Sequence, residues 1–197
     1  ADTPVYVLKE EEFKGHTAAD HSDAHWTEVT EDFINSLGPG IEDSLLLPSG
    51  NYYLSGDVES TRHLTVQGAV NLCLNGHTLS YTSEATKDRF IRMILIEDQV
   101  LCKDKVSTFS LCDCGSGGKI DAGNAGICVD VDSFCIFNMY GGTLSANEGR
   151  YALYVAGTAN ETVFNDQKYE TARANITGGS VTGIDAKAYA LVKVGGT

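Results

Sequence analysis

The sequence predicts an all-β protein: a right-handed parallel β-helix, or solenoid, with a short helical cap at its N-terminal end. Two observations predict this fold. Segments of the chain repeat one another, and the apolar residues within each segment alternate with a period of two, a pattern typical of stacked short strands. Each segment reads as a strand, a tight glycine turn and one more apolar residue. The segments are NLCLNGHTL (71–79), LCDCGSGGKI (111–120), IFNMYGGTL (136–144) and ANITGGSV (174–181).

Stacking these repeats places apolar side chains in columns that would fill the interior of the solenoid. The expected columns are Leu72, Cys112, Phe137 and Ala174; Leu74, Cys114, Met139 and Ile176; and Leu79, Ile120, Leu144 and Val181. A second repeat, at 126–133, 151–158 and 189–197, is interleaved with the first and supplies another strand to each rung. Insertions between rungs account for the uneven spacing and would lie on the outside.

The composition agrees with a globular solenoid. The chain has 197 residues and is 42% hydrophobic, which is enough for a continuous core, and it has 21 Gly but only 3 Pro, which suits many tight turns. It contains no apolar run of about 18 residues, so we expect no membrane insertion. The chain starts at Ala1 without a leader and stops within a repeat. We therefore expect either a mature secreted form or an excised piece of a longer protein, and in both cases a chain that continues past Thr197.

The negative charge is concentrated near the N-terminus. Residues 1–60 hold 13 Asp and Glu but only Lys9 and Lys14, whereas residues 61–197 hold 14 acidic and 12 basic residues. This balance repels nucleic acid and anionic membranes, so we expect no nucleic-acid partner.

The acidic segment reads as the cap. Thr30 can cap a helix whose first turn is acidic and whose stripe of Phe33, Ile34 and Leu37 is apolar, and Gly-Pro-Gly (38–40) would end it. Its apolar stripe should cover the first rung. We therefore divide the chain into a cap, 1–47, and a β-helix, 48–197.

A family resemblance lies in the same region. The string LPSGNYYLSGDVESTRHLTVQGAVNLCLNGHTLS (47–80), preceded by HWT (25–27), resembles the opening of pectate-lyase-like β-helix modules in large surface proteins of gut anaerobic Gram-positive bacteria. The resemblance covers roughly residues 16–80 and is only architectural afterwards. Before His16 the chain lacks the cysteine-containing strings expected of many relatives.

The resemblance implies a secreted protein attached to the bacterial cell surface. Some relatives are described as adhesins, and some gut surface proteins bind host immunoglobulins. A host protein such as immunoglobulin, or a glycan, is therefore the partner that the resemblance implies. It implies no catalytic residue.

The six cysteines are expected to be mostly core thiols, because Cys112 and Cys114 fall in the inward columns and Cys135 shares the face of Phe137. Disulfides are the alternative that export suggests, and a metal site is a third. The C-x-C spacing is too short for the usual C-x-x-C redox or zinc motif. For Cys73 and Cys102 the sequence does not decide between a thiol and a disulfide.

One segment contains residue types that commonly bind metal ions. His16, His21 and His25 lie within ten residues, together with Asp20 and Asp23, and neutral imidazole is a usual zinc ligand. A structural metal ion held by the three histidines is one interpretation. In the other, His25 packs the cap onto the first rung while His16 and His21 are solvated. No other cofactor is expected.

An enzyme on this fold would need carboxylates on adjacent rungs. The expected outward positions are Cys73, Asp113, Asn138 and Asn175 in one sheet, which suggests a hydrogen-bonded ladder. In the other sheet, Asp130 is expected to neighbour Tyr154 and Lys193 in later rungs. Neither set is a carboxylate column, so we expect no catalytic residue and no enzyme.

What remains is a binding surface of aromatic and arginine side chains on loops and sheet faces, the types that dominate protein interfaces. The candidate ligand-binding residues are Tyr81, Arg89, Tyr140, Arg150, Tyr151, Tyr154, Phe164 and Tyr169. The sequence thus favours a non-catalytic module that binds a host macromolecule. A carbohydrate-active β-helix, either a polysaccharide lyase or a glycan binder, and a stalk spacer are the alternatives.

Overall fold

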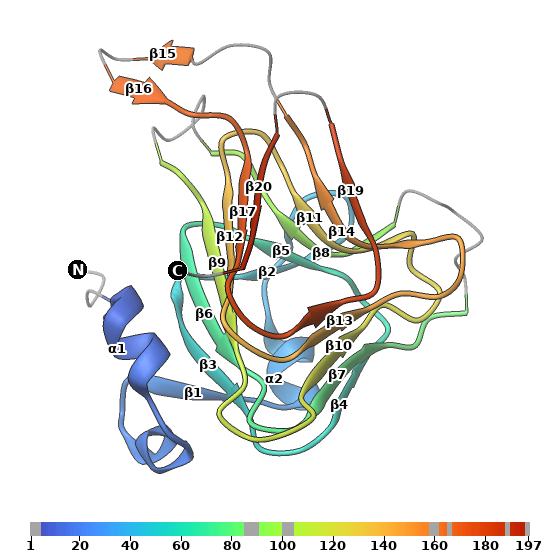
Figure 1. Ribbon diagram of the computed structural model, residues 1–197. Helices are drawn as coiled ribbons and strands as arrows, with labels where there is room; N and C mark the ends of the chain where they lie inside the picture. The colour runs from blue at the N-terminus through green and yellow to red at the C-terminus, as the bar shows by residue number, and fades with distance from the viewer. Residues whose placement is uncertain are drawn as a thin grey trace.

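The computed structural model describes residues 5–84, 91–99, 105–157, 162–164, 167–187 and 190–195. These residues form a parallel β-helix with three faces (Figure 1). The chain visits the faces in the same order in every coil: sheet B, then sheet A, then sheet C. The expected fold class is confirmed.

The three sheets are named here by the strands that pair within them. Sheet A contains β1 (Trp26–Val29), β3 (Gly50–Leu54), β6 (Ala69–Cys73), β9 (Thr108–Cys112), β12 (Ile136–Met139), β17 (Arg173–Ile176) and β20 (Leu191–Val194). Sheet B contains β2 (Leu45–Leu47), β5 (Leu64–Val66), β8 (Arg92–Ile96), β11 (Ile127–Val131), β14 (Tyr151–Val155) and β19 (Ile184–Ala186). Sheet C contains β4 (Val58–Ser60), β7 (Thr78–Tyr81), β10 (Lys119–Asp121), β13 (Thr143–Ser145) and β18 (Ser180–Val181). An antiparallel pair, β15 (Thr162–Phe164) and β16 (Gln167–Tyr169), stands outside the coils (Figure 1).

The predicted column in sheet C is confirmed. Ile120 pairs with both Leu79 and Leu144, and Leu144 pairs with Val181. Leu79, Ile120 and Leu144 are buried in the main core. These residues lie directly after the glycine turns, so a count from the turns gives their register correctly.

The two predicted columns in sheet A are correct in their last two members and wrong in their first two. The observed columns are Val70, Phe109, Phe137 and Ala174, and Leu72, Leu111, Met139 and Ile176. The cause is the turn between sheets A and C, whose length changes from coil to coil, so an alignment through the glycines misplaces the strand before it. Cys112 pairs with Cys73 and, like it, faces outward. The observed register differs from the expected one by three residues here (Phe109 in place of Cys112), and an odd shift moves a side chain to the opposite face.

The last copy of the interleaved repeat, at 189–197, was expected in the same sheet as the other two copies, which is sheet B. This expectation is wrong. β20 pairs with β17 in sheet A, and β19 takes the place beside β14 in sheet B. Asp185 therefore lies opposite Tyr154, the position expected for Lys193, which pairs instead with Asn175.

The outward amide ladder of sheet A exists, and it contains Asn138 and Asn175 as expected. Asn175 Nδ2 donates to Asn138 Oδ1 at 2.9 Å, and Asn71 Nδ2 donates to Asn51 Oδ1 at 2.9 Å. Ser110 stands between the two pairs in place of Asp113, and Asn71 takes the place expected for Cys73. Stacked amides satisfy their own hydrogen-bonding groups, so they hold the coils in register.

The predicted cap helix is confirmed as α2 (Glu31–Ser36). Thr30 Oγ1 accepts a hydrogen bond from Phe33 N at 3.1 Å, Ile34 is buried, and the rings of Phe33 and Tyr52 lie 5.6 Å apart. The helix therefore covers the core of the first coil. The boundary at 47/48 stays a prediction; β1 and β2, which precede it, already pair with strands of the β-helix.

Two more elements precede β1: α1 (Glu10–Gly15) and the 3₁₀ helix η1 (Ala18–Ser22). They lie outside sheet A (Figure 1), where Phe13 and Trp26 are buried beside Cys73 and Cys112. This is a second, smaller apolar cluster on the outer face of the β-helix.

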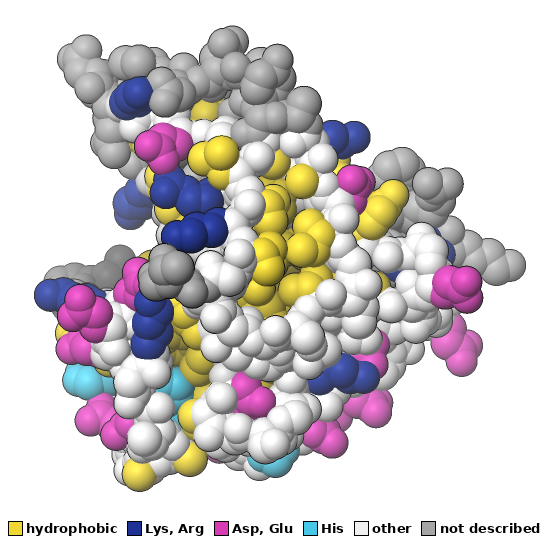
Figure 2. Space-filling view, in the orientation of Figure 1, with side chains coloured by type: hydrophobic (Ala, Val, Ile, Leu, Met, Phe, Trp, Pro, Cys, Tyr) yellow, Lys and Arg dark blue, Asp and Glu magenta, His cyan; other side chains and the backbone are white. Residues whose placement is uncertain are grey.

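At the opposite end, the last coil leaves apolar side chains uncovered. Ile184, Leu191 and Val194 are exposed, and hydrophobic side chains are visible through this end in Figure 2. Among the described residues no helix is long and apolar enough to cross a membrane.

Candidate functional site

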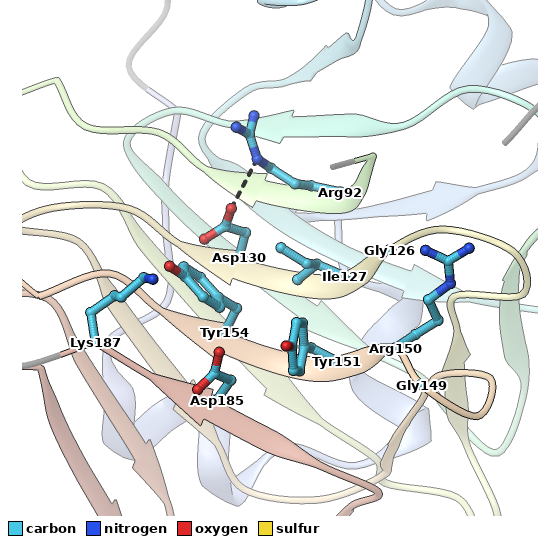
Figure 3. Close-up of a pocket in the computed structure, with 10 residues that line it drawn as sticks. All are labelled: Arg92, Gly126, Ile127, Asp130, Gly149, Arg150, Tyr151, Tyr154, Asp185 and Lys187. Carbon is cyan, nitrogen blue, oxygen red and sulfur yellow. Dashed lines mark ion pairs between the residues drawn. The ribbon is translucent and has the colours of Figure 1, made fainter. Parts of the chain in front are cut away.

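The outer face of sheet B carries a groove with a volume of about 320 Å³ (Figure 3). Strands β8, β11, β14 and β19 form its floor, so four successive coils contribute side chains to it. The residues that line the groove are Arg92, Gly126, Ile127, Asp130, Gly149, Arg150, Tyr151, Tyr154, Asp185 and Lys187.

Three of the predicted ligand-binding residues meet in this groove: Arg150, Tyr151 and Tyr154. Tyr151 is 39% exposed, and its ring lies 6.2 Å from that of Tyr154. The buried Leu153 and Val155 on either side of Tyr154 fix β14 in the core. The tyrosine rings are thus presented by a rigid strand and not by a loop.

The groove contains charges of both signs. Arg92 Nε lies 2.9 Å from Asp130 Oδ2, and the same guanidinium pairs with Glu42 at 2.5 Å. Lys187 Nζ lies 5.8 Å from the centre of the Tyr154 ring. Burial raises the pKa of Asp130 to about 7, and Arg92 opposes this rise.

The groove continues along the sheet toward the N-terminal end. A second hollow of about 310 Å³ shares Arg92 and is bordered by Glu42, His63 and Thr65. Together the two hollows run from β5 to β19, which at about 4.8 Å per strand spacing is about 19 Å. This length suits an extended ligand or a protein surface.

Other predicted binding residues lie elsewhere. The expectation that Tyr81 and Tyr169 are exposed is wrong: both are buried, Tyr81 in the main core and Tyr169 against Phe134. Tyr140 is half-buried, with Lys14 Nζ 4.6 Å from the centre of its ring.

Two predicted residues cannot be placed in a site. Arg89 lies outside the described residues, and Phe164 is described only as part of the backbone of β15.

The sequence interpretation missed Arg92, Asp185 and Lys187 as groove residues. It places Asp130 among the outward positions but expects Lys193 opposite Tyr154, because it does not recognise the strand Ile184–Ala186. The alternation Ile-Asp-Ala in that strand was the available signal.

Two of the three histidines of the predicted metal site lie together, and two cysteines stand beside them in place of the third histidine. His16 and His21 lie beside Cys73 and Cys114, with one ligand atom of each within 4.8 Å of the others. His25 is absent from this cluster and packs its ring against that of Tyr6 at 4.7 Å.

The expectation that Cys114 points into the core is also wrong, since its thiol lies in this outer cluster. Hydrogen bonds with Cys112 and His16 hold the pKa of Cys73 well below its usual value. The shared bond with Cys73 raises the pKa of Cys112, and burial raises that of Cys114 to about 12.

Comparison with family models, curated proteins and solved structures found no match to this chain. The parallel β-helix is therefore shown by its own strand pairing, and the family resemblance stays a resemblance.

Proposed function

We propose that this chain is a non-catalytic binding module of a secreted or wall-attached bacterial surface protein, and that it holds a host macromolecule in the groove on sheet B. The observation that carries the proposal is the convergence of Arg150, Tyr151 and Tyr154 in one groove. Tyrosine and arginine are the side chains that most often dominate the energy of protein interfaces. Because both tyrosines stand on β14, a strand held within a sheet, little backbone entropy is lost when they bind.

The charges of the groove favour a folded protein as the ligand over a neutral glycan. Arg92, Arg150 and Lys187 alternate with Asp130 and Asp185. Such a pattern complements a surface that itself carries both signs, and it gives orientation and specificity. Immunoglobulin is the host protein that the family resemblance implies, and we take it as the first ligand to test.

The experiment measures binding of the purified protein to polyclonal immunoglobulin by surface plasmon resonance. Tyr154→Ala and Arg150→Ala should each weaken binding by about 1 to 3 kcal/mol, roughly 5-fold to 150-fold in Kd. Tyr6→Ala is the matched control, because Tyr6 is 45% exposed and lies outside the groove. The melting temperature should change in none of the three.

A ligand held through the constant framework of the antibody would leave the antigen site free, so antibodies of many specificities should bind alike. If immunoglobulin and other serum or mucin proteins all fail to bind, or if Tyr6→Ala weakens binding as much as Tyr154→Ala, the groove is not a protein-binding site. A spacer module predicts the first of these outcomes.

One observation favours a carbohydrate-active β-helix as the second candidate. Asp130 and Asp185 flank Tyr154 on neighbouring strands (Figure 3), which puts their Cα atoms about 10 Å apart. Paired carboxyl groups at about 6.5 to 9.5 Å serve inverting glycosidases. Release of oligosaccharide from neutral or uronic-acid polysaccharides, abolished by Asp185→Asn, would establish this function instead.

A further inference from the structure

We propose that His16, His21, Cys73 and Cys114 form a structural zinc site that fastens the N-terminal segment to the outside of sheet A. The four residues come from three separate parts of the chain: η1 and the turn before it, the end of β6, and the turn after β9. The stacking of coils brings them together. One ligand atom of each lies within 4.8 Å of the other three.

The distances between the ligand atoms are close to those of a tetrahedral metal site. Cys73 Sγ and Cys114 Sγ lie 3.3 Å apart, and Cys114 Sγ lies 4.0 Å from His21 Nε2. In a tetrahedron, ligand bonds of about 2.3 Å to sulfur and 2.0 to 2.1 Å to nitrogen separate two sulfurs by about 3.8 Å and a sulfur from a nitrogen by about 3.6 Å. The two sulfurs are thus about 0.5 Å closer together than in such a site, and the sulfur and nitrogen are about 0.4 Å farther apart, so side-chain shifts of about half an ångström would admit the ion. The sulfurs are too far apart for a disulfide bond of about 2.05 Å.

The ligand types select zinc among the common cations. Two thiolates and two neutral imidazoles are the set found in structural zinc sites, whereas calcium and magnesium require oxygen ligands. Two thiolates also balance the charge of a divalent ion. This balance matters because a net charge in an apolar surrounding is costly.

The shell around the cluster is built in the way that metal sites require. His16 Nδ1 lies 2.5 Å from the carbonyl oxygen of Phe13 and can donate to it, which leaves Nε2 for the metal. The His21 ring stacks on Tyr53 at 4.3 Å and meets Trp26 edge-on at 4.9 Å. The Trp26 ring also lies 4.7 Å from that of His16. These aromatic rings orient both imidazoles and restrict the access of water.

A fifth candidate ligand lies beside the four. Cys112 Sγ is 3.7 Å from His16 Nε2, so Cys112 could replace Cys114 if that thiol were removed. Cys73 and His21 are therefore the better residues to substitute.

Zinc at this place has a structural consequence. Between residues 5 and 25 the chain makes no strand pairing with the β-helix. It is held by the apolar contacts of Phe13 and by hydrogen bonds to the amides of Asn51 and Asn71. A zinc ion bound by His16, His21, Cys73 and Cys114 would add coordination bonds between this segment and sheet A. Removal of the metal should release the segment and leave the coils intact.

The first experiment measures the metal content of the full chain, purified under reducing conditions with any histidine tag removed. Inductively coupled plasma mass spectrometry should find about one zinc ion per chain. Cys73→Ser and His21→Ala should lose it. His25→Ala and Cys135→Ser are matched controls and should retain it, because His25 lies outside the cluster and Cys135 is buried in the main core.

A second measurement keeps the proposal testable if a variant fails to fold. Wild-type protein loaded with cobalt should show the intense thiolate charge-transfer and visible bands of a tetrahedral site. Chelation should also expose Lys14 to trypsin at least about tenfold faster, while circular dichroism keeps its β-sheet signal. A reduced, folded wild type without stoichiometric metal, a Cys73–Cys114 disulfide in the native protein, or zinc retained by both ligand variants would overturn the proposal.

Discussion

The register of sheet A can be tested by coupling two phenylalanine substitutions. Phe109 and Phe137 pair across β9 and β12, both are fully buried, and their rings stack with centres 5.7 Å apart. The register expected from the glycine turns puts Cys112, not Phe109, beside Phe137. The two registers therefore predict different partners for the same side chain.

The magnitude follows from the contact. A stacked aromatic pair is worth about 0.5 to 1.5 kcal/mol beyond the area that it buries. In a double-mutant cycle, Phe109→Leu and Phe137→Leu should therefore show a coupling free energy of that size. Cys112 lies three residues along the sheet from the position opposite Phe137, about 10 Å away. Cys112→Ala and Phe137→Leu should thus be additive within about 0.5 kcal/mol.

The assay is urea unfolding of the wild type, the three single variants and the two double variants, followed by circular dichroism at a fixed pH. Each coupling energy is obtained from four free energies of unfolding. Additive phenylalanine substitutions together with coupled Cys112 and Phe137 would refute the observed register and restore the one read from the glycine turns.

Further predictions concern the core, a buried acid and the thiols. Met139→Asp should unfold the protein, because an unpaired charge in the core costs several kcal/mol; a wild-type melting curve would show that Met139 is not inward. The raised pKa of Asp130, about 7 against 3.8, means that the folded state binds the proton more tightly, so stability should fall as the pH rises from about 4 through about 7. Asp130→Asn should reduce the dependence of the melting temperature on pH. An unchanged dependence would show that Asp130 is not its cause. Burial raises the pKa of Cys128 to about 12 and also raises that of Cys135, so both should react slowly with a thiol reagent until urea is added; rapid labelling of the native protein would show that they are accessible.

The candidate groove was predictable in part. Tyr151, Tyr154 and Arg150 are conspicuous in the sequence because aromatic and arginine side chains interrupt an otherwise apolar strand. Tyr81 and Tyr169 have the same chemistry but are buried. Residue type identifies a candidate for an interface, whereas exposure depends on which coil or insertion covers it.

The sequence by itself determined the class of fold, the cap helix and the core column of sheet C. These features depend on neighbours along the chain: the alternation of apolar residues, the side chain of Thr30 at its own helix, and the distance of Leu79 from its turn. The tertiary structure decided the register of sheet A, the face of each cysteine and the meeting of His16 with Cys73 and Cys114. Those contacts depend on how many residues each turn uses, and in parallel strands a change of one residue exchanges the inside for the outside.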